Sequence, residues 1–361
     1  MHFLPTRIFF GADAVRKSFV HLNQLGRKAL LVTGKHSAQK CGALDDVLNV
    51  LNGLKIESVL FDAVTENPIL ETVMHGAEFF RQNDCDFLVG IGGGSPIDAA
   101  KAIALTAANN LTQDRIYDTS AFKKTFPLAA IPTTAGTGTE ATQYSVLTDA
   151  ATQKKAGFGH DLAFPALALV DPKYTLSLSQ KVTLNTGIDA LSHLLEGIYS
   201  NKRTPLLFPL IFQGIRLIYK NLSIVLDHPS DLTARTALSQ SSLYGGITIA
   251  HTSTTLQHSI GYPLTSVYNV PHGLANGIVM QQIMDLYYPA LEAELTELFS
   301  FLQISKTDFF TWLDSFGLKL DAQLTDDFIA AKIPEVLASR NMANNPVQVK
   351  EPDIRALYKS L

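Results

Sequence analysis

The sequence Phe87-Leu-Val-Gly-Ile-Gly-Gly-Gly-Ser-Pro-Ile-Asp-Ala-Ala-Lys101 is typical of a buried strand, a glycine turn and a helix in direct succession. Glycines allow a backbone to approach a phosphate closely, and a helix N-terminus offers free N–H groups and the positive end of a dipole. The turn therefore predicts a phosphate-binding loop. The residues also fit an ordinary strand-to-helix turn, with Ser95 as the N-cap of the helix.

On both sides of this turn, short aliphatic runs alternate with helical patterns. Strands are predicted over Ala29–Thr33, Glu57–Phe61, Phe87–Ile91, Leu128–Ile131 and Ala166–Val170. Helices are predicted over Leu44–Leu51, Leu70–Arg81 and Ile97–Ala107. Strands that alternate with helices in this way predict a parallel sheet that is covered by helices on both faces.

The pattern changes after Asp171-Pro172, and long helical periodicities dominate from Thr183 onward. The expected fold class is therefore α/β plus all-α: an N-terminal parallel-sheet domain over residues 1–178, followed by an all-helical domain over residues 179–361. A chain of 361 residues is long enough for two such cores. A cleft between two domains is a favoured place for a ligand.

The composition excludes several classes of protein. A hydrophobic fraction of 46% and a charged fraction of 17% indicate a globular chain. With a net charge of -4 and no long run of basic residues, neither nucleic acid nor a membrane is expected as a partner. Cys41 and Cys85 are too few for a disulfide framework, and the first residues lack the order of a signal peptide. The expected location is the cytoplasm.

A second loop, Ile131-Pro-Thr-Thr-Ala-Gly-Thr-Gly-Thr-Glu140, also follows a predicted strand. Its threonine hydroxyls and glycines suit a ribose or a pyrophosphate, although threonines also satisfy the backbone of ordinary turns. Because the carboxyl ends of parallel strands meet at one edge of a sheet, the two loops are expected to lie together.

Four side chains of the helical half form a candidate metal site. Asp189 and His193 are four residues apart in a helical pattern, so they project from one face of the helix. His258 and His272 supply two further imidazoles, and this set suits Zn²⁺, Fe²⁺ or another first-row divalent ion. Each histidine alone also fits a capping or core role. His251, seven residues before His258, is an alternative ligand.

Across essentially its whole length the sequence resembles the iron-containing (group III) alcohol dehydrogenase family. The resemblance rests on the segments Gly92–Lys101, Pro132–Glu140, Asp189–His193 and Pro271–Asn276. It implies a dinucleotide-binding α/β domain followed by a helical metal-binding domain, and a homodimer. It also implies a metal ion, with Fe²⁺ expected and Zn²⁺ as the alternative, bound by Asp189, His193, His258 and His272. Many members carry a second histidine four residues after the ligand that corresponds to His258. Tyr262 stands there in this sequence, so a proton relay through that histidine is not expected. The expected catalytic residues are the four metal ligands, acting through the metal, and Tyr262 is a further candidate.

The same resemblance implies a set of cofactor contacts. They are Asn67, Gly93, Gly94, Ser95, Asp98, Thr133, Thr134, Thr137, Thr142, Lys155 and Leu178. Three of them also fit structural roles. Asn67 and Asp98 suit helix caps, and Lys155 suits a solvated charge on a hairpin with Ser145–Leu147.

The end of the predicted strand Ala29–Thr33 bears on the choice of cofactor. Many NAD sites place a carboxylate there to bind the ribose 2′-hydroxyl, and such a group repels the 2′-phosphate of NADP. Gly34 leaves room at this position, and the following Lys35, His36 and Ser37 supply charge or donors. Gly34 and Ser37 are therefore expected at the cofactor, with NADP preferred and NAD as the alternative.

Together these features predict an enzyme that moves a hydride between a nicotinamide cofactor and a small alcohol or aldehyde. Tyr144, Phe158 and Tyr262 are expected to flank the substrate. Lys and Arg are scarce around the ligand segments, so the substrate is not expected to be strongly anionic. The alternatives are a related enzyme such as a glycerol-dehydrogenase-like polyol dehydrogenase or a dehydroquinate synthase, and a nucleotide-binding module with a structural metal.

Overall fold

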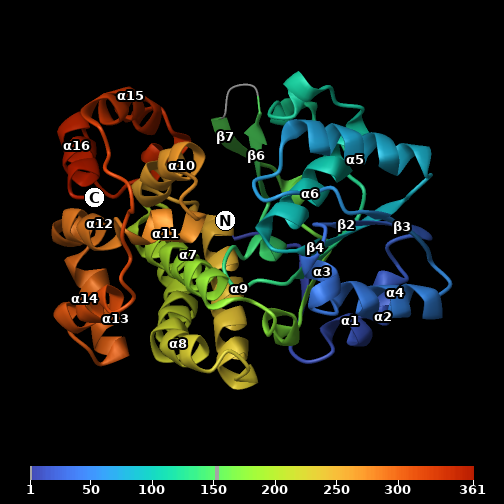
Figure 1. Ribbon diagram of the computed structural model, residues 1–361, viewed down its shortest axis with the longest axis horizontal. Coiled ribbons are helices and arrows are strands. Elements are labelled where there is room, and N and C mark those ends of the chain that lie inside the picture. Colours follow the sequence, from blue (N-terminus) through green and yellow to red (C-terminus); the bar gives the residue numbers. More distant parts are fainter. Residues whose placement is uncertain (1, 151–153) are drawn as a thin grey trace.

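A six-stranded parallel sheet organises the first half of the chain in the computed structural model, which describes residues 2–150 and 154–361 (Figure 1). Its strand order is β1-β8-β5-β4-β2-β3, and every neighbouring pair is parallel. The strands are β1 (Arg7–Phe10), β2 (Lys28–Thr33), β3 (Glu57–Phe61), β4 (Phe87–Gly92), β5 (Leu128–Pro132) and β8 (Leu167–Val170). The predicted strands are confirmed to within one residue at each end.

Strand β1 was not predicted from the sequence, so the strand at residues 28–33 is the second of the sheet and not the first. β1 lies at one edge, pairs only with β8 among the strands of the described residues, and leaves its end residues Arg7 and Phe10 exposed. A short, half-exposed edge strand of this kind carries little hydrophobic pattern, since its order comes from pairing with a neighbour.

Helices cover both faces of the sheet, as the alternation predicted. Leu30 and Val32 of β2 pack into the core beneath α5 (Leu70–Gln82) and α6 (Gly94–Asn109). The alternate residues Ala29 and Leu31 join the opposite core. That core includes residues from the helices α1 (Ala14–Lys17), α2 (Phe19–Leu22), α3 (Ser37–Lys40) and α4 (Ala43–Gly53). Successive strand residues point to opposite faces, so a run of apolar residues fills both cores at once.

A separate two-stranded hairpin rises beside the sheet, near the junction with the helical half (Figure 1). It consists of β6 (Tyr144–Asp149) and β7 (Lys154–Gly159), which pair antiparallel with Thr148 opposite Lys155. This confirms the predicted hairpin.

The second half of the chain is helical. Its helices are α7 (Gln180–Tyr199), α8 (Phe208–Asp227), α9 (Leu232–Thr252), α10 (Leu256–Tyr268), α11 (His272–Gly277), α12 (Met280–Tyr287), α13 (Glu292–Leu302), α14 (Lys306–Asp314), α15 (Asp326–Leu337) and α16 (Glu351–Lys359). They share one large hydrophobic core, and α7 runs through its centre between α8, α9 and α11. None of the helices within the described residues combines the length and the apolar character that a membrane span requires.

The two halves meet where the threonine loop touches helix α9. Gly138, at a φ of 60°, lies directly against Gly246 of that helix. A Cβ atom on Gly246 would stand 2.1 Å from the carbonyl oxygen of Gly138, which is far inside van der Waals contact. Two glycines are therefore required for this close approach of one backbone to another.

We expect Gly246→Ala to lower the free energy of unfolding by about 1–3 kcal/mol, because the added methyl group pushes helix α9 away from the loop. The strain outweighs the better helix propensity of alanine, which is about 1 kcal/mol. Thermal or urea unfolding of the purified variant measures the change.

Gly53→Ala is the matched control. Gly53 also lies in a helix, α4, and a Cβ atom there meets no atom within 4 Å. This variant should be as stable as the parent chain or slightly more stable. Equal stability of the two variants would show that the Gly138–Gly246 contact tolerates a side chain.

Candidate functional site

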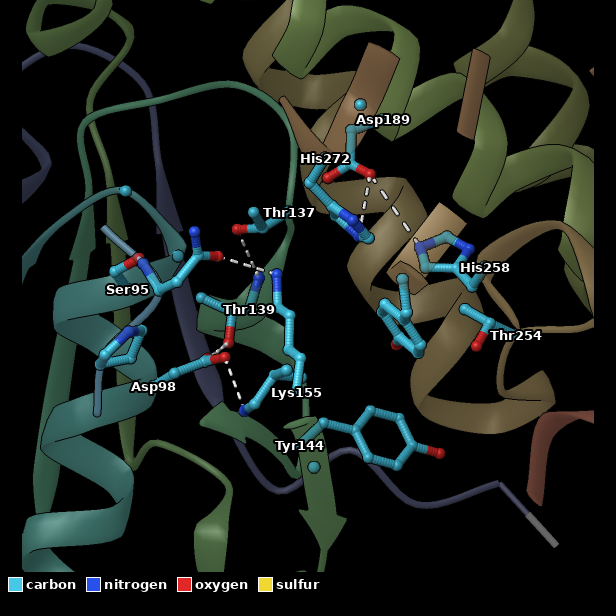
Figure 2. Close-up of a pocket in the computed structure, with 18 of the residues that line it drawn as sticks. Ser95, Asp98, Thr137, Thr139, Tyr144, Lys155, Asp189, Thr254, His258 and His272 are labelled. Carbon is cyan, nitrogen blue, oxygen red and sulfur yellow. Dashed lines mark hydrogen bonds and ion pairs between the residues drawn. The ribbon is translucent and has the colours of Figure 1, made fainter. Parts of the chain in front are cut away.

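A cavity of about 850 Å³ lies between the sheet and the helical half. Most of the predicted site residues line it. They are Gly34, Ser37, Asn67, Gly93, Gly94, Ser95, Asp98, Thr134, Thr137, Thr142 and Lys155 on the α/β side, and Asp189, His193, His258, Tyr262 and His272 on the helical side. Figure 2 shows Ser95, Asp98 and Thr137 across the cavity from Asp189, His258 and His272. Thr133 and Leu178 are not among the lining residues, and their contact with a cofactor stays a prediction.

The glycine turn joins β4 to α6 without a side-chain cap. Helix α6 begins at Gly94, three residues earlier than the predicted Ile97, with Gly93 at the N-cap position. Ser95 is therefore inside the first turn, and its hydroxyl accepts a hydrogen bond from the backbone N–H of Asn67 (3.2 Å). The interpretation of Ser95 as an N-cap is wrong, because that position belongs to a glycine.

The threonine loop packs closely on the glycine turn. A Cβ atom on Gly94 would lie 2.9 Å from the methyl group of Thr137, and one on Gly93 would lie 3.2 Å from that of Thr134. The expected meeting of the two loops at one edge of the sheet is confirmed. Because both loops present backbone and hydroxyl groups without bulky side chains, the space between them suits a phosphate chain.

A buried lysine that was not predicted fixes the threonine loop to α6. Lys101 donates hydrogen bonds to the carbonyl oxygen and hydroxyl of Thr139 (2.7 Å each), to the hydroxyl of Thr142 (3.1 Å) and to the carbonyl oxygen of Tyr144 (2.8 Å). Burial lowers the pKa of Lys101 to about 8, opposed by the carboxylate of Asp98. Its position three residues after Asp98, in a helix of small apolar residues, is the signal that sequence reasoning missed.

Asp98 belongs to the same network and does not cap α6. Its carboxylate accepts hydrogen bonds from the hydroxyl of Thr139 (2.5 Å) and from the backbone N–H of Val146 (2.9 Å). Burial raises the pKa of Asp98, and the Lys101 ammonium group acts in the opposite direction. The neighbouring Glu140 is also buried, which raises the pKa of its carboxyl group to about 7.

Lys155 and Asn67 connect the hairpin to the glycine turn. The Lys155 ammonium group donates a hydrogen bond to the side-chain oxygen of Asn67 (2.9 Å), and Asn67 has a positive φ of 55°. Burial lowers the pKa of Lys155, while the carboxylates of Asp189 and Asp98 act in the opposite direction. Lys155 is thus no solvated hairpin charge, and Asn67 is no helix cap, because the N-cap of α5 is Ile69.

Asp189, His258 and His272 converge from helices α7, α10 and α11. Their nearest ligand atoms all lie within 4.8 Å of one another (Figure 2). Asp189 is 3% exposed and His258 2% exposed, whereas His272 is half-buried and reaches the open space of the cavity. His193 adjoins it, since its Nε2 atom lies 3.1 Å from Nε2 of His258.

Glu196, which was not predicted, orients the ring of His258. Its carboxylate accepts from Nδ1 of His258, and also from the backbone N–H (2.6 Å) and hydroxyl (2.8 Å) of Thr255. Burial acts to lower the pKa of His258, but the Glu196 carboxylate outweighs burial and raises it. Glu196 follows Asp189 and His193 at spacings of four and three on one face of α7, a pattern that the sequence already contains.

The donor set fits a divalent metal ion. The side-chain amide nitrogen of Asn276 lies 3.1 Å from Asp189 Oδ1, 3.2 Å from His258 Nε2 and 3.4 Å from His272 Nε2, so three acceptor atoms face one point. Because Nδ1 of His258 faces a carboxylate, its Nε2 atom presents a lone pair to that point. One carboxylate and several imidazoles are ligands that Fe²⁺ and Zn²⁺ accept.

His251 is engaged away from this cluster. Its Nε2 atom accepts a hydrogen bond from the backbone N–H of Phe3 (3.2 Å), and its Nδ1 atom lies 2.7 Å from the carbonyl oxygen of Ile247. It does not line the cavity. The alternative that made His251 a ligand is therefore wrong.

Among the aromatic residues, Tyr144 and Tyr262 line the cavity. The ring of Tyr262 stacks on that of His272, with centroids 5.7 Å apart and an interplanar angle of 10°. Phe158, which was expected beside the substrate, is instead buried in the hydrophobic core against Phe122.

Two adjoining segments of the chain match one family in succession. The iron-containing alcohol dehydrogenase family matches residues 5–172, and the C-terminal part of the Fe-containing alcohol dehydrogenase family matches residues 183–361. The chain belongs to the iron-containing alcohol dehydrogenase family. It is an NAD(P)-dependent oxidoreductase that acts on CH–OH groups.

Individual relatives agree with this assignment. The chain is 32% identical to the NAD-dependent methanol dehydrogenase of Bacillus methanolicus over 285 residues, which are 78% of this chain and 74% of the relative. It is 33% identical to the NADPH-dependent butanol dehydrogenase of Clostridium saccharobutylicum, over 78% of this chain and 72% of the relative. Among solved structures, an iron-containing alcohol dehydrogenase from Thermotoga maritima superposes with a TM-score of 0.94 at 35% identity, covering 100% of this chain and 98% of the other.

For this alcohol dehydrogenase, we expect His272→Ala to lose most of its bound metal, because one of the converging ligand atoms disappears. Glu196→Gln should lower metal affinity by about 10- to 100-fold, because the group that orients His258 loses its charge. Elemental analysis after dialysis against a weak chelator measures both effects.

His251→Ala is the control, since it removes an imidazole of the same half that lies outside the cluster. It should retain the metal content of the parent enzyme. If His251→Ala lost its metal while His272→Ala retained it, His251 and not His272 would be the ligand.

Proposed function

We propose that the enzyme is a metal-dependent alcohol dehydrogenase and aldehyde reductase that uses Fe²⁺, with Zn²⁺ as the alternative, and prefers NADP(H). Asp189, His193, His258 and His272 would hold the metal. The observation that carries the proposal is the convergence of Asp189, His258 and His272, directly across one cavity from the glycine turn and the threonine loop.

The proposed cofactor lies along the α/β wall of the cavity. Its phosphates would contact the glycine turn and the threonine loop, and Lys155 and Asn67 would hold a ribose or the nicotinamide end. The chemistry supports this arrangement, because free backbone N–H groups at the start of α6 and several hydroxyls line this wall. The remaining contacts of the proposed set are Gly34, Ser37, Ser95, Asp98, Thr133, Thr142 and Leu178.

The metal, when bound, supplies a Lewis acid that polarises the oxygen of an alcohol or aldehyde, and the nicotinamide supplies the hydride acceptor or donor. The protein's own side chains position these groups. Glu196 fixes the orientation of His258, and Asn276 donates a hydrogen bond to Asp189 (3.1 Å). Tyr262 covers one face of His272, and burial raises the pKa of its hydroxyl to about 12, so it would act as a neutral hydrogen-bond donor.

The proposed substrate is a small primary alcohol or the corresponding aldehyde. Relatives named for methanol and butanol support this class. The alternative is a polyol substrate, as in a glycerol-dehydrogenase-like enzyme, and activity toward glycerol in excess of that toward butan-1-ol would favour it.

Removal of the metal tests the proposal. Protein that is shown by elemental analysis to be metal-free should not oxidise NADPH with butanal. Added Fe²⁺ should restore turnover, and Zn²⁺ should restore part of it. Turnover by the metal-free protein at the rate of the loaded enzyme would contradict the metal-dependent mechanism.

The cofactor preference depends on Gly34, which lines the cavity after β2 together with Ser37. A Cβ atom there would lie 3.2 Å from the carbonyl oxygen of Val64, so a small side chain enters with a slight shift. We expect Gly34→Asp to move the preference toward NAD(H) by about 1–3 kcal/mol, because a carboxylate repels the 2′-phosphate. The measurement is kcat/KM for both cofactors.

Gly34→Ala separates charge from bulk in this test. It adds the Cβ atom without the carboxylate and should keep the preference for NADP(H). A parent enzyme that favours NAD(H), or an Asp variant with an unchanged ratio, would show that Gly34 does not contact the ribose.

Two further expectations stay predictions. The family resemblance implies a homodimer, which sedimentation of the purified enzyme would detect. The division of the chain into units of residues 1–178 and 179–361 is likewise inferred from the change of sequence pattern.

A further inference from the structure

One end of the cavity carries a cation that the sequence analysis did not place there. Arg340 begins the short 3-10 helix Arg340–Asn344 after α15, and it lines the cavity although it lies far along the chain from the metal cluster. Its guanidinium group lies over β7, where a Cβ atom on Gly157 would be 3.6 Å from Nη2. Glycine at this position leaves the guanidinium group room beside the strand.

The side chain of Arg340 is exposed, and it has no hydrogen bond and no ion pair with any residue within 2–150 and 154–361. The carboxylates around the cavity have other neighbours. Asp98 accepts hydrogen bonds from Thr139 and Val146, and Asp189 accepts one from Asn276 (3.1 Å). Glu335 pairs with Lys332 (2.8 Å), and Glu66 acts on the pKa of Lys155. An arginine that faces a cavity with its five donors unpaired is available to an anion from outside the protein.

Neutral hydrogen-bonding groups line the cavity together with Arg340. They are Tyr144, Ser253, Tyr262 and Asn341. Ser253 follows the last residue of α9, and Asn341 follows Arg340 in the chain. Because these groups are neutral, none of them pairs with the charge of the guanidinium group.

Tyr262 connects this end of the cavity to the metal cluster. Its ring stacks on His272, and it lines the cavity together with Arg340, whose positive charge opposes the rise that burial causes in the pKa of the Tyr262 phenol. A substrate whose oxygen lies at the cluster and whose chain runs along Tyr262 would therefore bring its other end to the guanidinium group. A short carbon chain is about as long as one tyrosine side chain, so a small substrate spans this distance.

We propose that Arg340 binds a terminal carboxylate of the substrate, so that the enzyme acts best on short ω-oxo or ω-hydroxy acids. This inference rests on the proposed function and deepens it. A planar guanidinium group donates two parallel hydrogen bonds to a carboxylate, which gives both affinity and orientation. The sequence predicted a substrate that is not strongly anionic, because Lys and Arg are scarce in the segments around the metal ligands. Folding, however, brings Arg340 to the cavity from a distant segment.

A pair of four-carbon aldehydes tests the inference. With NADPH and the metal-loaded enzyme, kcat/KM should be higher for 4-oxobutanoate than for butanal. Arg340→Gln should lower the ratio of the two values by about 10- to 100-fold, mainly through the KM for 4-oxobutanoate. Arg340→Lys should give an intermediate ratio, because lysine keeps the charge but loses the fork geometry.

Arg355→Gln is the matched control. Arg355 is an arginine of α16 that pairs with Glu351 (2.7 Å) outside the cavity, so its loss should leave the ratio unchanged. Calorimetric titration with 4-hydroxybutanoate and with butan-1-ol gives a readout that does not depend on turnover, and Arg340→Gln should weaken binding of the acid selectively.

The outcomes separate this inference from the proposed function. Turnover of butanal without a preference for 4-oxobutanoate, or a preference that survives in Arg340→Gln, overturns the role of Arg340 and leaves the proposed function intact. Absence of turnover with either aldehyde overturns the proposed function, and the inference falls with it.

Discussion

Two carboxylates buried on one face of helix α7 impose the main constraint on this enzyme. Asp189 and Glu196 are shielded from water inside a helical bundle, where an unpaired negative charge is strongly disfavoured. The surrounding residues supply what these charges need. His258 and Thr255 satisfy Glu196, while Asn276, the neighbouring imidazoles and the expected metal ion face Asp189. Helices α10 and α11, which share one hydrophobic core with α7, carry His258 and Asn276 to these two carboxylates.

The other wall of the cavity obeys a different constraint, because its shape depends on how closely two backbone segments approach each other. The glycine turn and the threonine loop lie so close that a Cβ atom on Gly94 would collide with Thr137, and one on Gly93 would be in tight contact with Thr134. The contact between Gly138 and Gly246 then sets the distance from this wall to the helical half. One wall therefore presents N–H groups and hydroxyls, the other presents metal ligands, and the cavity between them has room for a cofactor and a substrate.

Much of this architecture could be predicted from the sequence, because the central strands and helices carry strong local patterns. The aliphatic runs at Lys28–Thr33 and Phe87–Gly92 are buried on both faces and coincide with strands. The glycine turn, the threonine loop and the ligands of the metal cluster also carry local signals. What the sequence missed depends on long-range contacts. β1 is ordered by pairing with β8, Lys101 bonds to a loop about forty residues away, and Arg340 reaches the cavity only through the packing of α15 and the turn that follows it.

The hydrogen bonds of Lys101 have a consequence for motion. Four bonds join its ammonium group to Thr139, Thr142 and Tyr144, so the threonine loop, the start of α6 and the hairpin strand β6 are bound into one unit. A loop clamped in this way does not swing open as a flap, since opening it would strip a buried ammonium group of its partners. We therefore expect the threonine loop to keep its position against α6 and β6 when a dinucleotide enters or leaves the cavity.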